Sequence, residues 1–493
     1  MREFYFSWLI AAIALPLAGA LCIRRIRDFN AAWWLCVLFS GASAACSLAA
    51  WVNFAWLGGN TVTDPAWLPS TISRELLLLD RLNAPLLALG ALTCFLVMLS
   101  TPRGKAERFP FAVSLLSQSL ILATVGCQFT WGIVALLALG VLPPLWELRQ
   151  RNKPTRVFVV HMAAFVLLLV SGAWLVSNPS ATALSLRSQV PSVWMLLPLM
   201  LALFIRCGVA PFHCWITDLF EHGSFGGSMI TVIPLVGAHA TMKLLIPVAT
   251  PGQLSSMGWF VLATAFYAAG MSLVQKEMRR FFCYLFISHA ALVLFGLLTM
   301  HELGVTGALC VWLSSGLSLT GLGLILRALE ARHGRIALTG YHGVYEHTPL
   351  LAIGFLVMGL ASVGFPCTFG FVGAEILVDA AIHLNPLAGV TVVVAAMLNG
   401  IAVVQVYFRL FTGSRFKSTV PLRVSAREQL AVLTVCSLIF VGGLFPQFPV
   451  EACSNAARVL LTLNRASGDD QHQLLDATSK VNVPQPLPGG TPR

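Results

Sequence analysis

The sequence predicts an all-α polytopic membrane protein with about fourteen transmembrane helices. Its mean hydropathy is +0.81, and 57% of its 493 residues are hydrophobic while only 10% are charged. This composition lies far outside that of soluble globular proteins. In addition, apolar stretches of membrane-spanning length recur along the chain, and basic residues gather in alternate connecting loops.

Each predicted span has the roughly 20 predominantly apolar residues that a helix needs to cross the hydrocarbon core of a bilayer. After the last span, residues 466–493 are polar and rich in Pro and Gly, which predicts a disordered tail. The predicted spans cover residues 4–23, 31–51, 81–100, 110–127, 131–146, 156–176, 192–210, 228–248, 256–274, 281–299, 304–326, 350–373, 387–412 and 428–446.

Lys and Arg collect in the loops that follow odd-numbered spans, and Arg74 and Arg187 are the main exceptions. By the positive-inside rule these loops are cytoplasmic, which places both termini on the outer side of a bacterial-type inner membrane. The net charge of +11 therefore reflects topology, and no nucleic-acid partner is predicted. The clusters are Arg24, Arg25 and Arg27; Arg103, Lys105 and Arg108; Arg149, Arg151, Lys153 and Arg156; Lys276, Arg279 and Arg280; Arg332 and Arg335; and Arg415, Lys417, Arg423 and Arg427.

The motifs that hold cofactors or metals are missing from the sequence. The twelve cysteines are dispersed, without a Cys-x-x-Cys pair or a Cys/His cluster, so neither an iron–sulfur cluster nor a structural metal is expected. There is likewise no glycine-rich nucleotide fingerprint or P-loop. We expect no cofactor, no metal and no autonomous redox chemistry.

Two predicted helices are interrupted by proline, the seventh at Pro211 and the twelfth at Pro366. The breaks lie five helices apart, and a repeat with an odd number of helices inverts its topology. We therefore expect helices 4–8 and 9–13 to be inverted repeats. The corresponding boundaries are 1–109 for helices 1–3, 110–250 and 251–415 for the repeats, 416–465 for the last helix with an outer segment, and 466–493 for the tail.

Each break lies beside an ionisable residue, Arg206 before the first and Glu375 after the second. Interrupted helices at corresponding positions of two halves point to an ion or substrate site. Their freed backbone groups are tolerated in a membrane only where protein or cavity water satisfies them. The chain is therefore predicted to be a transporter core.

Three segments of this region carry a family resemblance: RCGVAPFHCWITD at 206–218, QKEMRRFFCYLFISH at 275–289 and GFPCTFGFVGAE at 364–375. They resemble the broken-helix and connecting motifs of the antiporter-like subunits of respiratory complex I (NADH:quinone oxidoreductase) and of Mrp cation antiporters. In that family a lysine precedes Pro-Leu-His-x-Trp-Leu-Pro-Asp, and Gly-x-Pro-x-x-x-Gly-Phe is followed by Lys or Glu. The resemblance covers roughly residues 75–415.

The resemblance implies a path for protons or monovalent cations through water-filled half-channels, carried by ionisable residues at mid-membrane. It also implies a lipid-embedded subunit that works with other membrane subunits of a larger energy-converting complex, at most as one subunit of a translocase. Several family positions differ here: the lysine is Arg206, the glutamate of helix five falls at Ala138, and the helix-eleven positions read Ser314, Ser315 and Ser318.

The candidate ion-pathway residues are Arg206, Glu375, His239, Glu147 and Lys243. Arginine cannot be deprotonated in a protein, so Arg206 can tune neighbours or gate but cannot release a proton. Its expected partner is a carboxylate, either Glu147 or Glu375. Glu375 is alternatively a helix cap or interface residue, and His239 a neutral core histidine. Lys243 is expected to extend to an interface, and Glu147 could equally balance nearby arginines.

Further residues at the breaks are expected to have structural roles. Pro211 and Pro366 interrupt their helices, while His213, Trp215 and Asp218 are expected to cap and anchor the broken seventh helix. Another charged pair, Asp80 with Arg81 at the start of the third span, is expected to be interfacial.

Two classes of function remain open from the sequence. The first is an ion-translocating subunit of a complex I-like or Mrp-like assembly, or the membrane subunit of an inorganic-carbon pump with a related fold. The second is a non-pumping scaffold that keeps the inherited fold. Charged residues at mid-membrane are costly to retain without a use, which favours the transport class.

Overall fold

The chain is almost entirely helical in the computed structural model. The residues that the structure describes are 8–26, 28–56, 77–101, 109–177, 193–413 and 424–465, and among them no strand longer than an isolated bridge occurs. The prediction of an all-α protein is confirmed for this part of the chain. Outside the described residues lie the predicted tail, 466–493, and the basic residues Arg27, Arg74, Arg103, Lys105, Arg108, Arg187, Arg415, Lys417 and Arg423.

The first half of the chain forms short and long apolar helices, because a chain in hydrocarbon must satisfy its backbone groups internally. These helices are α1 (Trp8–Ile23), α2 (Phe29–Trp56), α4 (Asn83–Leu99), α6 (Phe111–Gly126), α7 (Thr130–Leu139), α8 (Leu142–Gln150), α9 (Arg156–Ser177), α10 (Val193–Cys207), α11 (Cys214–His222), α12 (Phe225–Val232), α13 (Val236–Ala240) and the π-helical turn η2 (Thr241–Leu245).

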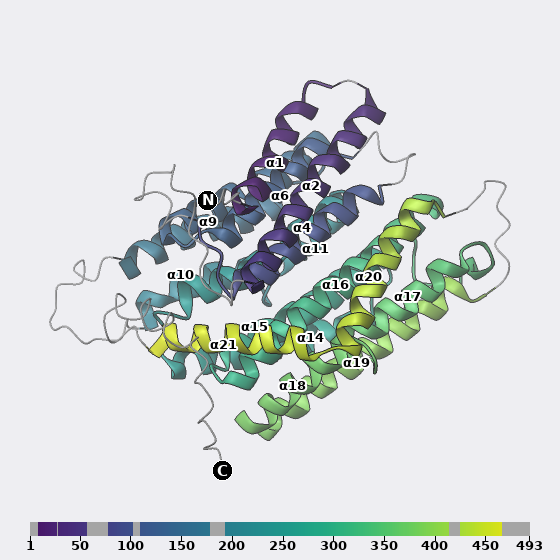
Figure 1. The fold of residues 1–493 in the computed structure, drawn as a ribbon. Coiled ribbons are helices and arrows are strands. Elements are labelled where there is room, and N and C mark those ends of the chain that lie inside the picture. Colours follow the sequence, from purple (N-terminus) through teal and green to yellow (C-terminus); the bar gives the residue numbers. More distant parts are fainter. Residues whose placement is uncertain are drawn as a thin grey trace, which may run out of the picture.

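The second half contains longer helices and a final amphipathic one. Residues 447–465, expected only as an outer segment, form this last helix, which runs across the ends of its neighbours (Figure 1). The elements are α14 (Pro251–Leu273), α15 (Met278–Leu298), α16 (Glu302–His333), the 3₁₀ turn η3 (Val344–His347), α17 (Pro349–Ser362), α18 (Phe369–Leu384), α19 (Pro386–Phe411), α20 (Ala426–Leu444) and α21 (Gln447–Arg465).

The lengths of these helices suit a multi-pass membrane protein. Within the described ranges, nine helical segments are long and apolar enough to cross a membrane. Five shorter apolar helices accompany them: Trp8–Ile23, Asn83–Leu99, Phe111–Gly126, Val193–Cys207 and Pro349–Ser362.

The core of the bundle is built around α15 and α16, whose residues are buried along nearly their whole length. Helix α16 packs against α4, α15, α17, α18, α20 and α21, so it connects the early and late parts of the chain (Figure 1). Peripheral helices differ, because α19 exposes Leu387, Val390, Val393 and Met397 on one face. An apolar face of this kind suits contact with lipid.

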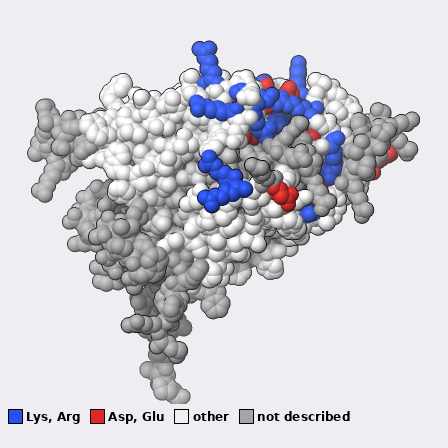
Figure 2. Space-filling model, turned by 90° about the horizontal axis from the view of Figure 1, so that it is seen from above, with Lys and Arg blue, Asp and Glu red and all other residues white. Residues whose placement is uncertain are grey.

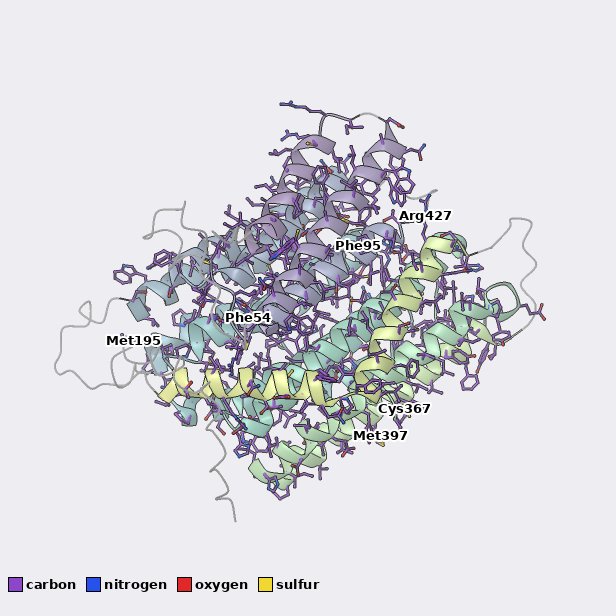
Figure 3. The ribbon with its side chains drawn as sticks, in the orientation of Figure 1. Phe54, Phe95, Met195, Cys367, Met397 and Arg427 are labelled. Carbon is purple, nitrogen blue, oxygen red and sulfur yellow. The ribbon has the colours of Figure 1, made fainter. Side chains whose placement is uncertain are left out.

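Charged side chains cluster on the face of the molecule seen in Figure 2. Figure 2 shows Lys and Arg side chains gathered on part of the surface, while much of the rest carries no charge. Arg279 forms a two-bond ion pair with Glu330, both bonds being 2.6 Å long. At the start of α20, the Arg427 guanidinium carbon lies 3.9 Å from the centroid of the Trp33 ring (Figure 3). These contacts join α15 to α16 and α20 to α2.

Glycine permits the closest helix contacts. A Cβ atom at Gly172 on α9 would lie 2.5 Å from the backbone nitrogen of Leu199 on α10. At Gly307 on α16 it would lie 2.7 Å from the nitrogen of Leu377 on α18. Small residues of this kind let membrane helices approach backbone to backbone, which brings α10 and α18, the two helices at the breaks, against their neighbours.

Candidate ion-translocation site

The seventh span is interrupted between α10 and α11. Residues 208–213 separate the two helices, Gly208 has a φ of 73°, and the Ala210–Pro211 peptide bond is cis. Trp215 is 1% exposed and bridges the gap, because its indole Nε1 donates to the carbonyl of Ile205 at 2.7 Å. The geometry agrees with the expectation that Trp215 anchors the broken helix.

The other two residues expected to cap this break do not do so. His213 is the N-cap residue of α11, but its side chain makes no capping hydrogen bond; the ring instead lies beside Tyr267 and Tyr284, with centroid distances of 5.6 and 5.7 Å. Asp218 contacts His222 one turn later, at 3.1 Å between Oδ1 and Nδ1. The capping role expected for His213 and Asp218 is therefore wrong, because both side chains contact neighbours other than the free helix end.

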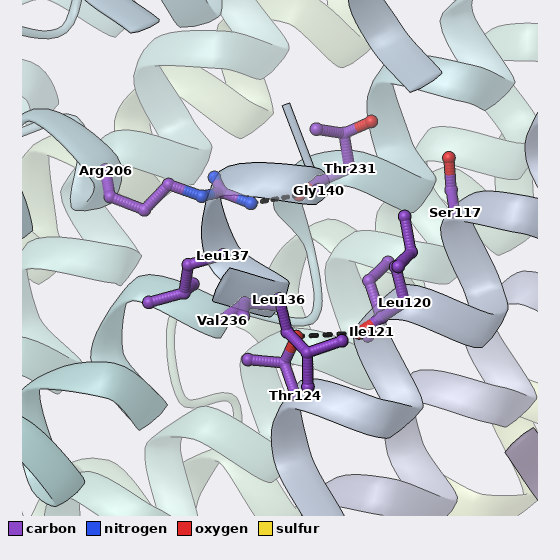
Figure 4. Close-up of a pocket in the computed structure, with 10 residues that line it drawn as sticks. All are labelled: Ser117, Leu120, Ile121, Thr124, Leu136, Leu137, Gly140, Arg206, Thr231 and Val236. Carbon is purple, nitrogen blue, oxygen red and sulfur yellow. Dashed lines mark hydrogen bonds between the residues drawn. The ribbon is translucent and has the colours of Figure 1, made fainter. Parts of the chain in front are cut away.

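Arg206 lies in the last turn of α10 and reaches into a small cavity. Its Nη2 donates a long 3.5 Å hydrogen bond to the carbonyl of Thr231, and its guanidinium carbon lies 5.4 Å from the Trp215 ring centroid. The volume of this cavity is about 20 Å³, which leaves room for about one water molecule. In Figure 4 the guanidinium points toward Thr231, and Ser117 and Thr124 on α6 line another part of the wall.

No carboxylate lies within ion-pair distance of Arg206 among the described residues. The expected partners were Glu147 and Glu375, and both expectations are wrong. Glu147 pairs with Arg151 at 3.0 Å and accepts a 2.7 Å hydrogen bond from the backbone nitrogen of Ser224. The Glu147 carboxylate therefore pairs with a nearby arginine, in agreement with the structural alternative, and also accepts a backbone N–H at the start of α12.

Glu375 is exposed on α18, on a face that the described part of the chain does not cover. The twelfth span is interrupted at residues 363–368, where Gly364 and Cys367 have φ values of 89° and 67°. Pro366 lies in this interruption and is exposed. Glu375 therefore lies on the helix that follows the break, as expected. Its side chain, however, points away from the interior of the bundle and cannot contact Arg206 within this chain.

The eighth span is also interrupted, which was not predicted from the sequence. Helix α12 ends at Val232, Leu235 has a φ of 49°, and α13 continues into the π-helical turn η2. Pro234 is the sequence signal for this break, since proline cannot donate the backbone hydrogen bond that a continuous helix requires. The described bundle therefore contains a break in the eighth span in addition to the two predicted ones.

Lys243, in η2, forms a partly buried polar network with two residues from distant segments. Its Nζ lies 2.6 Å from Asp80 Oδ2 and 2.8 Å from Gln128 Oε1, and Gln128 Nε2 donates to Asp80 Oδ2 at 3.0 Å. The Lys243 and Asp80 side chains are only 11% and 15% exposed. The Lys243 ammonium therefore ends on Asp80 and each neutralises the other, while the expectations that Lys243 extends to an interface and that Asp80 is interfacial stay predictions.

His239 lies one turn before Lys243 and is fully buried. Neither ring nitrogen has a hydrogen-bond partner among the described residues. By contrast, Ser314, Ser315 and Ser318 on α16 donate to carbonyls of their own helix. Of the candidate ion-pathway residues, His239 and Lys243 are the two that lie together, on the eighth span.

The described residues contain no group of three or more His, Cys, Asp or Glu side chains that could hold a metal ion. The breaks carry protonatable side chains, the positive charge of Arg206 and a small cavity lined mostly by apolar residues.

Comparison with known proteins agrees with this architecture. The family model for the transmembrane region of NADH:quinone oxidoreductase and Mrp antiporter subunits matches residues 117–399. The chain is 27% identical over 253 residues to NADH-quinone oxidoreductase subunit M of Rickettsia bellii, covering 50% of this chain and 51% of that protein. It is 24% identical over 489 residues to NAD(P)H-quinone oxidoreductase chain 4 1 of Synechococcus elongatus, covering 92% and 91%.

The chain thus spans about half the length of the first subunit M relatives that it matches, whereas the alignment with the chain 4 relative is nearly complete. Among solved structures, a chain of respiratory complex I from Thermus thermophilus superposes with a TM-score of 0.78 at 21% identity, covering 92% of this chain and 99% of that chain.

A chain of the Mrp complex from a Dietzia species superposes equally well, with a TM-score of 0.78 at 17% identity and with coverage of 96% and 99%. At these identities the two structures show the shared fold. The family model matches more than half of the sequence, and the resemblance found in the three sequence motifs is confirmed: the chain belongs to the NADH:quinone oxidoreductase/Mrp antiporter transmembrane family.

Proposed function

We propose that this protein is a proton- or cation-translocating membrane subunit of a larger energy-converting complex. The observation that carries the proposal is the set of partly buried charged groups beside interrupted helices, with Arg206 at one break and the Lys243–Asp80 pair after another. Charged side chains at membrane depth are costly and mark ion pathways, and family membership supports the same function.

The proposed topology has fourteen transmembrane helices, with inverted repeats at helices 4–8 and 9–13 and the boundaries given above. Nine long helical segments and five shorter apolar ones within the described ranges support this count. We place both termini on the outer side of a bacterial-type inner membrane. In that orientation Glu147, at the end of α8, lies at the cytoplasmic end, and Asp80, Gln128 and Lys243 lie at the outer end.

The proposed ion path uses Arg206, His239 and Lys243, with Pro211 and Pro366 keeping the seventh and twelfth spans open. Arg206 contributes fixed positive charge, because its guanidinium does not release a proton. Glu147 is assigned to the cytoplasmic end of the path. Protonation of its carboxylate there would weaken the hydrogen bond that it accepts from the Ser224 backbone nitrogen at the start of α12.

Glu375 is assigned to the part of the ion path that lies at the boundary with a neighbouring membrane subunit. On the same helix Asp379 and His383 lie 3.4 Å apart, and their side chains are 58% and 67% exposed. A charged residue facing hydrocarbon costs about 2.5 kcal/mol or more, and α19, by contrast, exposes the apolar side chains Leu387, Val390, Val393 and Met397. A neighbouring subunit covering α18 would remove this cost.

A scaffold without ion transport is the second candidate. It is favoured by the absence of a carboxylate near Arg206 in the described structure and by Ala138, where the family has glutamate. Under this alternative the buried charges only stabilise the fold.

Proton uptake into liposomes decides between the two functions. The complex is purified through a tag on this chain, reconstituted with a pH-sensitive dye inside, and driven by a potassium diffusion potential. We expect uptake with the wild type and its loss in R206A and E375Q, while E302Q, at an exposed ion pair with Arg458, behaves as the wild type. Assembled R206A and E375Q complexes that both retain full uptake would support the scaffold.

A further inference from the structure

We propose that the ion pair that exchanges protons in this chain is Lys243 with Asp80, held in place by Gln128, at the outer end of the eighth span. This inference rests on the proposed function and adds to it the groups that release the proton. It assigns a role to Asp80 and Gln128, two residues that lie outside the interrupted helices.

The break in the seventh span lacks a group that can release a proton. Arg206 remains protonated in any protein environment, and its only hydrogen bond among the described residues goes to the Thr231 carbonyl. Position 138 is alanine. A lysine paired with a carboxylate is the arrangement that can become neutral by proton transfer, and Lys243 with Asp80 is such a pair.

The two carboxylate oxygens of Asp80 have different hydrogen-bond partners. Oδ1 accepts hydrogen bonds from the backbone nitrogens of Leu82 and Asn83, at 3.0 and 2.7 Å, so it fixes the start of α4. Oδ2 accepts from Lys243 at 2.6 Å and from Gln128 at 3.0 Å. The carboxylate is therefore anchored through one oxygen, while the other faces the lysine.

Gln128 holds the geometry of the pair from a third segment. Its amide oxygen accepts from Lys243 at 2.8 Å while its amide nitrogen donates to Asp80. The segment before α4 is held beside the α6–α7 loop by a bridge between Leu77 and Cys127. Gln128 is therefore a positioning residue, because it keeps Nζ directed at Oδ2.

In the proposed step one proton moves from Lys243 to Asp80. The N–H bond of the Lys243 ammonium breaks and an O–H bond forms at Asp80 Oδ2, which converts a charged pair into a neutral amine and a neutral acid. Low dielectric disfavours separated charges, which makes the neutral pair accessible. Asp80 then releases its proton to the outer side, and Lys243 receives another from the interior, which restores the ion pair.

The same helical segment reaches back to the Arg206 cavity. A Cβ atom at Gly237 would lie 3.1 Å from Arg206 Cγ, and His239 lies between Gly237 and Lys243 with both ring nitrogens lacking partners among the described residues. The other titratable groups that face the pair are His239 from α13 and Cys127 from the α6–α7 loop. His239 is thus placed to deliver the proton that Lys243 takes up.

The test compares two aspartates that both cap helices. Asp28 accepts hydrogen bonds from the backbone nitrogens of Asn30 and Ala31, as Asp80 does at α4, but no lysine pairs with it in the described structure. In the liposome assay D80N is expected to lower proton uptake roughly 100-fold, whereas D28N retains it. K243M leaves the Asp80 cap intact and is expected to match D80N. D80E is expected to recover uptake with a displaced pH profile.

The outcomes separate this inference from the proposed function. Wild-type uptake in both D80N and K243M, with uptake lost in R206A and E375Q, would overturn the assignment of the pair and leave the proposed function standing. Absence of uptake in the wild type would contradict the proposed function itself. If D80N fails to assemble, K243M and D80E decide the question, since both keep the carboxylate that caps α4.

Discussion

Replacing Trp215 by phenylalanine tests how the two halves of the seventh span are held together. The indole Nε1 donates to the Ile205 carbonyl at 2.7 Å, and the ring centroid lies 5.4 Å from the guanidinium carbon of Arg206. W215F keeps an aromatic ring at this buried position but removes the N–H group and part of the ring. It therefore cuts one connection across the break without removing the hydrophobic contact altogether.

The expected loss of stability follows from these contacts. The Ile205 carbonyl also accepts from the backbone nitrogen of Gly208 at 3.1 Å, so it keeps a donor, and the net loss from the hydrogen bond is about 1 kcal/mol. A weaker cation–π contact and the space left by the smaller ring add roughly 1 to 2 kcal/mol. The free energy of unfolding should fall by roughly 2 to 3 kcal/mol.

Equilibrium unfolding in mixed detergent micelles measures this difference. Trp194 at the start of α10 is 80% exposed and provides the matched control, since W194F should change the free energy of unfolding by no more than about 0.5 kcal/mol. If W215F is as stable as W194F, the indole does not connect the two halves and the reasoning is refuted.

Two further predictions concern packing and charge, and the same unfolding experiment measures both. G172A places a Cβ atom 2.5 Å from the backbone nitrogen of Leu199, so it should destabilise the protein by roughly 1 to 3 kcal/mol; an unchanged free energy would mean that α9 and α10 are not this close. E330Q breaks a two-bond pair with Arg279 and should cost roughly 3 to 5 kcal/mol. E302Q, at an exposed pair, should cost less than about 1 kcal/mol, and equal losses would contradict the described burial.

The sequence was informative wherever the signal is local. Apolar length and proline position act on a helix directly, so the membrane class and the breaks at Pro211 and Pro366 could be predicted. The family motifs are also short and contiguous, which made the resemblance recognisable. The break after α12 was missed, although Pro234 marked it, because Leu235 adopts a positive φ without the glycine that usually signals one.

Contacts between distant segments could not be predicted from one sequence. Lys243 and Asp80 are separated by 163 residues, and nothing local in either segment identifies the other. The orientation of Glu375 was equally inaccessible, because the face that a helix presents to its own bundle depends on how its neighbours pack. The expected partners of Arg206 failed for this reason: ionisable residues at plausible depths were paired without knowledge of which way each points.

The central claim is that water reaches the interrupted helices inside the membrane, and amide hydrogen exchange in lipid nanodiscs tests it most directly. The account predicts that the backbone amides of residues 208–213 except Pro211, and of residues 233–237 except Pro234, exchange well before those of the buried helix α15 (Met278–Leu298). Equal protection of the interrupted segments and α15 would mean that no water enters there, and the ion path described above would be contradicted.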